Sequence, residues 1–367
     1  MKARPAAVAA GFLALTATIA ASAEPMDLAL ERLVQNPSCR TADGVFPNPA
    51  SPPDPANPGW CEPDNLAFKK LVNQLGFAFA PTAMHSARTT GYGGFDVSVE
   101  GSFTKISSSE DYWKRGTQGS VDPSTNSHAT RNGSPDSLLQ LYSVKIRKGF
   151  GFGLELAGMV GFMPKTSLVG GGADVRLSLL EGFRTGIVGI LPDVALGGGV
   201  RTITGTPELQ LTIASLDAQI SKPLAIQDSS ILTPWVGYQH LWMFGDSGLV
   251  DLSPGTDAQG YCGYAGTNAP GNPAANKQVY DGQPICTAPG GNAHLDFNNN
   301  AVFDHVRLER HRLLVGANYR YEMVMIGAEF ITDLTSPADA QSSKEDKADL
   351  KDEDRQWTIG VELGAAF

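Results

Sequence analysis

The chain has 367 residues, and its 38 acidic side chains outnumber its 28 basic ones to give a formal net charge of −10. A chain with this acidic excess is a poor match for nucleic acid, so we expect no nucleic-acid partner. After the first 23 residues no apolar run approaches the roughly 20 residues that a membrane-spanning helix needs. If the chain sits in a membrane, it must cross it as a β-barrel, which agrees with 41 Gly, 24 Pro and only 18% charged residues.

Residues 1–23 have the features of a secretory signal peptide. Lys2 and Arg4 precede an apolar stretch from residue 6 to residue 20, and residues 21–23 (Ala-Ser-Ala) form a small-residue cleavage site. Cleavage would remove two of the 28 basic residues and no acidic one, which leaves 26 against 38 and a net charge of −12. We therefore expect an exported, acidic mature protein.

Residues 24–91 form a lead-in that precedes the regular alternation. Its first part, to residue 63, is rich in Pro, Asn, Asp and Ala and has no sustained period, which predicts an extended periplasmic segment. Asp64 can cap a short helix that ends near Leu75, with Gly76 as its stop. The sequence therefore predicts one short helix before the strands begin.

The four cysteines fall into two close pairs, Cys39 with Cys61 and Cys262 with Cys286. An exported chain meets an oxidising environment, so we expect two local disulfides, although four cysteines allow three pairings. Each bridge would close a loop of just over twenty residues and stabilise the fold by roughly 3 kcal/mol in the chain-entropy model. The first bridge would pin the lead-in, and the second would close a long loop.

From Gly93 onward, large apolar side chains alternate with small or polar ones, which is typical of strands with one face in an apolar medium. Ten segments have this pattern: residues 95–104, 137–148, 150–160, 168–180, 192–203, 208–221, 230–244, 304–320, 322–334 and 355–367. We interpret residues 92–367 as an all-β domain, a transmembrane antiparallel up-and-down β-barrel of about ten strands, with a range of eight to twelve. An exported β-sandwich is the alternative, because its strands would also alternate.

The segment 208–221 contains one break in this alternation. Large apolar residues lie at odd positions up to Ile213 and at even positions from Leu216. A strand that keeps one apolar face needs an extra residue at such a break, so the sequence predicts a β-bulge near Ala214 and Ser215.

The lengths of the connections give an independent test of a barrel. The three longest, residues 106–136, 245–303 and 335–354, fall at the same end of the predicted strands, and tight turns occur at the other end. Outer-membrane barrels have long extracellular loops and short periplasmic turns. We therefore expect the long loops outside the cell and both termini in the periplasm, and a sandwich does not predict this one-sidedness.

The last strand, residues 357–367, has the most specific pattern. One face carries large apolar side chains and ends on the C-terminal phenylalanine, with Trp357, Ile359, Val361, Leu363 and Phe367. This strand resembles the assembly signal of Gram-negative outer-membrane β-barrel proteins, and the resemblance covers the signal peptide and residues 93–367. It implies an outer-membrane location, contact with membrane lipid and lipopolysaccharide, and recognition by the barrel-assembly machinery. The architecture is shared by many functions.

Strand parity predicts a crowded, charged barrel interior. The inward charges are Asp96, Glu100, Lys145, Arg147, Glu155, Asp174, Arg176, Arg201, Asp217, Arg312, Arg320, Glu329 and Glu362. A ten-stranded barrel is only a little wider than the eight-stranded barrels whose side chains nearly fill them, so we expect these charges to pair across the lumen. This disfavours a wide, water-filled general porin.

Several glycines lie on the same inward faces and leave space inside the barrel, among them Gly197, Gly199, Gly327 and Gly360. We predict that part of residues 64–90 packs into this space as a plug, with His85 and Arg88 able to pair with inward carboxylates. The alternative is that the glycines only allow the strands to bend.

A weak calcium pattern precedes the third-last strand. Oxygen ligands stand at positions 1, 3, 5 and 9 of a loop, in Asp296, Asn298, Asn300 and Asp304. The glycine of position 6 is absent and Arg307 occupies position 12, so a polar loop explains the pattern equally well. We expect no other cofactor and no catalytic residue, because no cysteine metal cluster, Walker loop or G-x-S-x-G motif occurs.

Three functions remain open. A narrow or gated channel for small solutes is favoured by the lumen charges and the glycines. A structural or surface-interaction barrel that displays the loop of residues 245–303 is the second. An outer-membrane hydrolase using His240 or His311 is the third, and we do not expect an enzyme because no paired nucleophile and base stand out.

Overall fold

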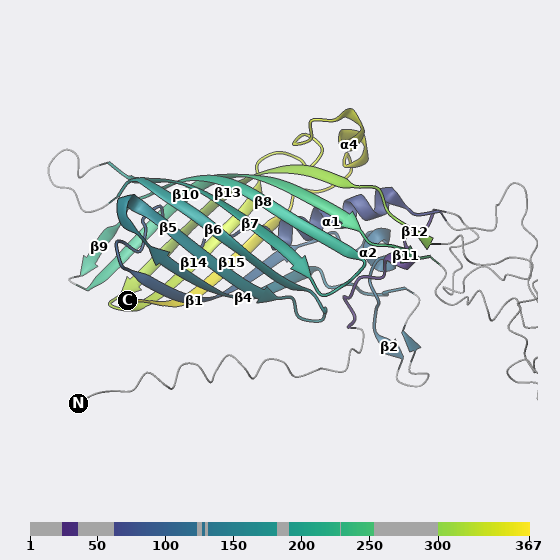
Figure 1. Cartoon of the computed structure of the whole chain (residues 1–367), viewed down its shortest axis with the longest axis horizontal. Coiled ribbons are helices and arrows are strands. Elements are labelled where there is room, and N and C mark those ends of the chain that lie inside the picture. The colour runs from purple at the N-terminus through teal and green to yellow at the C-terminus, as the bar shows by residue number, and fades with distance from the viewer. Residues whose placement is uncertain are drawn as a thin grey trace, which may run out of the picture.

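The computed structural model describes residues 24–35, 62–122, 127–128, 131–181, 191–227, 229–252 and 300–367. Ten antiparallel strands pair in a closed ring, so the predicted all-β, up-and-down barrel of ten strands is confirmed (Figure 1). In ring order the strands are β1 (Phe95–Lys105), β4 (Leu138–Gly149), β5 (Leu154–Phe162), β6 (Val169–Leu180), β7 (Asp193–Thr204), β8 (Leu209–Ser221), β10 (Ser230–Ser247), β13 (Val306–Tyr321), β14 (Val324–Asp333) and β15 (Trp357–Ala366). The last strand closes the ring against the first, with Leu363 opposite Val99.

Shorter elements occupy the connections and the residues before the barrel. They are η1 (Leu30–Arg32), α1 (Asn65–Phe79), α2 (Asp111–Arg115), β2 (Val121–Asp122), β3 (Ser127–His128), η3 (Gly151–Gly153), β9 (Leu224–Gln227), β11 (Val250–Asp251), β12 (Asn300–Ala301) and α4 (Lys344–Asp349). Among the described residues, no helix has the length and apolar character to cross a membrane.

The barrel has two different ends, which we call the turn end and the loop end. The tight turns between β4 and β5 and between β13 and β14 lie at the turn end, together with the C-terminus. There the backbone N–H groups of Phe95 and Phe367 each donate to the other residue's carbonyl oxygen, at 3.0 and 2.7 Å. The long connections lie at the loop end, together with α1, α2 and α4 (Figure 1).

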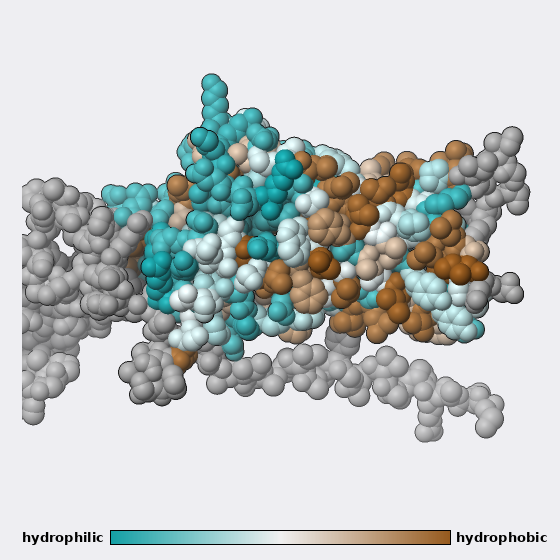
Figure 2. Space-filling model, turned by 180° about the vertical axis from the view of Figure 1, so that it is seen from behind, coloured by the Kyte–Doolittle hydropathy of each residue, from teal (hydrophilic) through white to brown (hydrophobic). Residues whose placement is uncertain are grey.

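An apolar belt surrounds the half of the barrel next to the turn end, the turn half. Outward side chains such as Val99, Val160, Leu216 and Leu363 are 56% to 65% exposed. Figure 2 shows hydrophobic residues gathered over this half and hydrophilic ones over the opposite, loop half. A continuous apolar surface is unfavourable in water by about 25 cal/mol per Å², so the belt is the surface that faces lipid. The chain is therefore a transmembrane β-barrel, the architecture of Gram-negative outer-membrane proteins.

Two details of the predicted strands were wrong. The segment expected to begin at residue 150 begins at Leu154, because residues 150–153 form a tight turn in which Phe152 has a φ of 63°. The bulge expected near Ala214 is absent, since β8 pairs with both neighbouring strands without a register shift. The apolar side chains of β8 change face because the surroundings change along the barrel: those near the loop end point inward.

Helix α1 begins as predicted and ends later. Asp64 caps it by accepting from the N–H of Ala67 at 3.1 Å. The predicted stop at Gly76 was wrong, because the helix continues to Phe79. A Cβ at Gly76 would lie 2.6 Å from the sulfur of Met243, so this glycine permits close packing of the helix on the barrel wall.

The lead-in does not lie at the end that the sequence predicted. The N–H of Met26 donates to the carbonyl of Lys165 at 2.9 Å, and Asp27 binds the backbone and hydroxyl of Ser167, both in a loop-end connection. Residues 24–35 and the C-terminus are therefore at opposite ends of the barrel. The expectation that both ends of the mature chain lie on one side was wrong, because residues 65–94 pass through the interior. The proposed signal peptide and the four cysteines lie outside the described residues.

Candidate functional site

The candidate site is the lumen of the barrel, which contains α1 and the segment that follows it. We call residues 80–94, between α1 and β1, the lumen segment. It runs from the inner end of α1 to the turn end. Three wall glycines make room for it: an added Cβ would lie 3.2 Å from Pro81 at Gly199, 3.1 Å from the Met84 carbonyl oxygen at Gly327, and 2.2 Å from the Met84 side chain at Gly360.

Backbone N–H groups of the lumen segment donate to carboxylates of the wall. Met84 donates to Glu329 at 2.9 Å, and Thr90 donates to Glu155 at 2.8 Å. Thr89 donates to Glu181, the residue after β6, through both its N–H and its hydroxyl, at 3.0 and 2.8 Å. These carboxylate oxygens accept hydrogen bonds from an extended backbone that pairs with no strand at these residues, and the bonds hold the segment in the lumen.

Arg147 is the centre of the largest charge cluster in the turn half. Its guanidinium lies 3.3 Å from Asp96 and 3.3 Å from Glu100, both on β1, and 2.5 Å from Glu362 on β15. Lys145, which is on β4 like Arg147, lies 2.8 Å from Glu100. All five side chains are almost completely buried. The inward charges do pair, but the pairs join strands that are adjacent or one apart in the wall, so the expected pairing across the lumen was wrong for this cluster.

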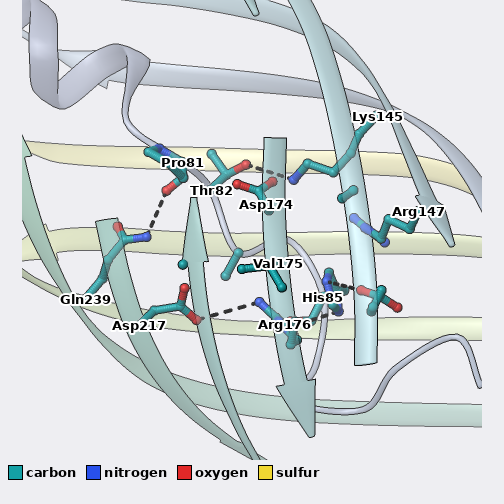
Figure 3. Close-up of a pocket in the computed structure, with 14 residues that line it drawn as sticks. Pro81, Thr82, His85, Lys145, Arg147, Asp174, Val175, Arg176, Asp217 and Gln239 are labelled. Carbon is teal, nitrogen blue, oxygen red and sulfur yellow. Dashed lines mark hydrogen bonds and ion pairs between the residues drawn. The ribbon is translucent and has the colours of Figure 1, made fainter. Parts of the chain in front are cut away.

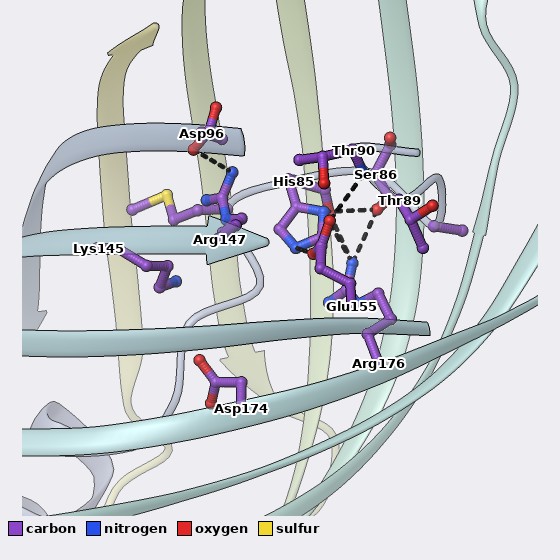
Figure 4. A network of polar contacts seen from close by, with 12 residues as sticks. His85, Ser86, Thr89, Thr90, Asp96, Lys145, Arg147, Glu155, Asp174 and Arg176 are labelled. Carbon is purple, nitrogen blue, oxygen red and sulfur yellow. Dashed lines mark hydrogen bonds and ion pairs between the residues drawn. The ribbon is translucent and has the colours of Figure 1, made fainter. Parts of the chain in front are cut away.

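His85 links the lumen segment to the second charge cluster. Its Nδ1 lies 3.0 Å from the guanidinium of Arg176, and its Nε2 lies 3.2 Å from a carboxylate oxygen of Glu155 (Figure 4). The same Nδ1 also lies 2.9 Å from the carbonyl oxygen of Ser86. His85 therefore joins the lumen segment to an arginine of β6 and a glutamate of β5.

The remaining predicted charges lie inside the barrel, with one exception. Arg201 pairs with Asp174 at 2.7 Å, and Arg176 lies 3.7 Å from Asp217. Arg312 binds the side chain of Gln239 and the carbonyl oxygen of Pro81. The exception is Arg320, whose parity predicts an inward direction but which is exposed at the turn end and donates to the Glu322 carbonyl. Of the predicted set, seven carboxylates and five cations are buried or half-buried in the lumen.

A small polar cavity remains beside the lumen segment (Figure 3). His85, Lys145, Arg176, Asp217 and Gln239 are among its lining residues. Water centres can occupy about 20 Å³ of it, which is room for about one or two water molecules. One carboxylate oxygen of Asp217 is buried without a hydrogen-bond partner, as expected where such a water binds. The cavity therefore has room for water but not for a larger solute.

The loop half of the lumen is filled by the apolar face of α1. Its side chains Phe68, Leu71, Val72, Leu75, Phe77 and Phe79 are at most 1% exposed. They pack against inward residues of the wall, among them Leu211, Ile213, Leu241, Met243 and Leu308. Where this core meets the charged half, the ring of Phe77 lies 4.8 Å from the guanidinium of Arg310 and 5.0 Å from that of Arg312.

A polar seam joins α1 to the loop-end connections, and the sequence did not indicate it. Gln74 accepts from Trp113 at 2.8 Å and from the N–H of Ser107 at 2.9 Å, and it donates to Tyr112 and Glu353 at 2.6 and 2.8 Å. One amide therefore ties the helix to two connections. No local pattern marks this glutamine, because its partners are 33 to 279 residues away.

The candidate calcium residues are only partly described. Asp296 and Asn298 lie outside the described residues, Asn300 is in β12, and Asp304 accepts from the side-chain amide of Asn65 at 2.6 Å. Within the described ranges no group of three acidic, histidine or cysteine side chains is arranged to hold a metal ion. The calcium site stays a prediction.

The two histidines of the hydrolase alternative lie on the outside of the barrel. His240 stacks on Trp242 with ring centroids 4.2 Å apart and contacts Glu309 at 3.0 Å. His311 binds the hydroxyl of Tyr238 at 2.7 Å. Aromatic rings at the rim of the apolar belt are typical of the membrane interface, so these side chains are best explained as part of an interfacial girdle.

No known family model matches the sequence, and no curated protein matches it significantly. Among solved structures, the outer membrane protein OprG from Pseudomonas aeruginosa aligns over 77% of this chain and 99% of its own, with 9% identity and a TM-score of 0.28. Ail of Yersinia pestis aligns over 75% and 99% with 8% identity and a TM-score of 0.25. Omp33 of Acinetobacter baumannii aligns over 76% and 100% with 8% identity and a TM-score of 0.24. Similarity at this level indicates no solute or partner for this chain.

Proposed function

We propose that the protein is a gated outer-membrane channel for small polar solutes, and that the described arrangement is its closed state. The observation that carries this proposal is how the lumen is filled at the level of the apolar belt. An extended backbone held by hydrogen bonds lies there, in space left by wall glycines such as Gly199 and Gly360. A barrel that serves only as an anchor needs no such space, because wall side chains can fill a narrow lumen. Residues 64–94 are then the gate.

In the same proposal the loop end faces the cell exterior and the turn end faces the periplasm. Long loops on the outside and short turns on the inside are the rule for outer-membrane barrels. Residues 24–35 would then lie at the cell surface, and the chain would reach the periplasmic start of β1 through its own barrel. A tag inserted after residue 24 should be accessible to antibody on intact cells, and a tag that needs permeabilised cells would contradict this orientation.

The two parts of the gate differ in how firmly they are held. Withdrawing α1 would expose six buried apolar side chains at about 1.5–3 kcal/mol each, a cost on the order of 10 kcal/mol. At about 1.4 kcal/mol per tenfold change, this corresponds to an open fraction of roughly 10⁻⁷. The lumen segment is held by hydrogen bonds to charged groups, which contribute about 1.5–3 kcal/mol each and which water can replace. This cost argues against a constitutively open pore, and in this proposal opening needs a stimulus such as an applied potential.

Planar-bilayer recording on the refolded full-length protein tests the proposal. Rare, brief conductance steps are expected for the wild type. Glu155→Ala removes the acceptor of both Thr90 and His85, so openings should become about 10- to 100-fold more frequent, the equivalent of 1.4–2.8 kcal/mol. Glu345→Ala, in the exposed helix α4, should leave the opening frequency unchanged.

A variant that lacks residues 24–90 is the positive control, because its lumen should conduct steadily. Heat-modifiable gel migration must first establish that each variant is a folded barrel. If the deletion variant conducts while the wild type and Glu155→Ala stay silent at every applied potential, the channel proposal is overturned.

A surface-interaction barrel is the second candidate. The ordered loop-end cap favours it, because Gln74, Tyr112 and Glu353 hold the connections in one arrangement above α1. A fixed polar platform of this kind can present one shape to a partner. This candidate predicts a silent bilayer for the wild type and a partner whose binding is lost when residues 334–356 are exchanged.

Contacts with lipopolysaccharide and with the assembly machinery are also proposals. Strand β15 presents Ile359, Val361 and Leu363 to lipid and is followed directly by the exposed Phe367, which supports a role in assembly. Removing Phe367 should lower the fraction of heat-modifiable barrel in the membrane. An unchanged fraction would show that assembly does not depend on this residue.

A further inference from the structure

We infer that the open channel selects cationic solutes, and that their binding positions are carboxylates which the lumen segment covers in the closed state. This inference rests on the proposed function as a channel. The first observation is the charge balance of the wall. The wall contains the seven carboxylates and five cations already described, together with the buried side chains of Asp193, Asp333 and Arg310. Among inward charges of the barrel strands that the structure describes, nine carboxylates thus stand against six cations.

The second observation is what compensates this excess. Instead of a cation, Glu329 and Glu155 receive backbone N–H groups of the lumen segment, at 2.9 and 2.8 Å. The hydroxyl of Thr82 lies 3.1 Å from Glu100 in the same way. When the segment moves, these carboxylates lose donors that stabilise their charge. A carboxylate in a confined, low-dielectric space then requires a counter-charge, and a cationic solute supplies it.

Glu329 is the position where a cation gains most. Its side chain is 3% exposed, and its Oε1 is buried with no hydrogen-bond partner. Over the described part of the chain no basic side chain forms an ion pair with it, whereas Glu362 and Glu100 share Arg147. An opened lumen therefore presents Glu329 as a negative charge without a local cation. Small cations should concentrate there, and anions should be repelled.

The test measures reversal potentials across a KCl gradient for openings of the full-length protein. The wild type should favour K⁺ over Cl⁻ by roughly threefold or more, as expected for a narrow pore lined by excess carboxylates. Glu329→Gln keeps the shape of the side chain and should lower the K⁺/Cl⁻ permeability ratio by about twofold or more. Glu329→Asp keeps the charge and should retain most of the selectivity.

The control is Glu345→Gln, on exposed α4 away from the lumen, which should leave the permeability ratio unchanged. Openings that prefer Cl⁻, or a ratio that Glu329→Gln does not alter, would overturn cation selection while the channel itself stands. Complete absence of openings in every variant, in a barrel shown to be folded, would overturn the channel and this inference with it.

Discussion

The two halves of the barrel are built in opposite ways. In the turn half, Val361 and Leu363 of β15 face lipid, and Glu362 between them is buried in the lumen. In the loop half, Gln210 and Thr212 of β8 face outward, and Leu211 between them is buried in the lumen. Side chains alternate in both halves, but the apolar side chains point outward in the turn half and inward in the loop half.

This inversion follows from the medium outside each half. Lipid surrounds the turn half, so its apolar side chains point outward and its charges point inward, where they bind one another and the lumen segment. The loop half extends beyond the apolar belt, so it is built like a soluble protein, with α1 as its core. The turn half should therefore depend on ion pairs and hydrogen bonds, and the loop half on apolar packing.

Arg147→Ala should have the largest effect and would break the turn half. The substitution leaves Asp96, Glu100 and Glu362 buried together with one cation fewer, and breaking a buried pair of this kind costs about 3–5 kcal/mol. Urea unfolding in detergent or lipid, followed by heat-modifiable migration, measures the loss.

The matched control is Arg307→Ala. Arg307 faces outward on β13, is 49% exposed and pairs with Asp246, so its removal should cost about 1 kcal/mol or less. Equal losses for the two arginines would show that the lumen pairs contribute no more than a surface pair.

Leu71→Ala should have the next largest effect and would break the loop half. Leu71 is completely buried in the core that α1 forms with the wall, and large-to-small substitutions at such positions cost about 2–5 kcal/mol. The same urea unfolding measures it. Leu66→Ala is the control on the same helix, because Leu66 is 43% exposed and should change stability by about 0.5 kcal/mol or less. A loss at Leu66 as large as that at Leu71 would contradict the role of α1 as a core.

The ten strands could be predicted from the sequence because their signal is local. In the turn half, period-two alternation directly reflects lipid on one side and a polar lumen on the other. The same reasoning failed at Ala214, where the change of phase in β8 predicted a bulge. The physical cause is the inversion between the halves. A change of phase at the same height in neighbouring strands would be the signal for a buried helix in the loop half.

For the lumen, the sequence predicted which charges point inward but not which residues they contact. Parity assigned charges to the inside, but which carboxylate pairs with Arg147 depends on the register of three strands. The end of α1 was missed because Gly76 serves close packing on Met243 rather than helix termination. The side of residues 24–35 was missed because their position depends on the path of residues 65–94 through the barrel, and no local pattern encodes that path.

Gln74→Leu should have an intermediate effect on stability. It would test the polar seam that joins α1 to the loop-end connections. Leucine fits the volume but leaves Trp113 Nε1 and the N–H of Ser107 without their acceptor, which costs about 1–3 kcal/mol. Protease cleavage within residues 107–116 and a change in tryptophan fluorescence should reveal the loosened connection. Gln140→Leu, outward on β4, is the control. Equal cleavage of both variants would show that the hydrogen bonds of Gln74 do not hold this connection in place.

The smallest effect should come from pH, at the contact between residues 24–35 and the wall. Burial and the nearby carboxylate of Glu31 raise the pKa of Glu208 to about 7, from an ordinary 4.5, and Glu31 is itself raised by burial. A raised carboxyl pKa means that the folded contact binds a proton more tightly than the free segment does. The contact is therefore firmest below about pH 4.5 and weakens as the pH rises through 7.

Amide hydrogen exchange of Leu30, corrected for the intrinsic pH dependence, measures this effect, because Leu30 is completely buried and its backbone lies next to Glu208. Protection should fall between pH 6 and pH 8 in the wild type and change much less in Glu208→Gln, where Glu31 is the carboxyl that remains in the contact. Protection that rises with pH, or that falls equally in the variant, would assign the pH response to another group. A response confined to residues 24–35 would also separate the loop-end cap from the charged half of the barrel.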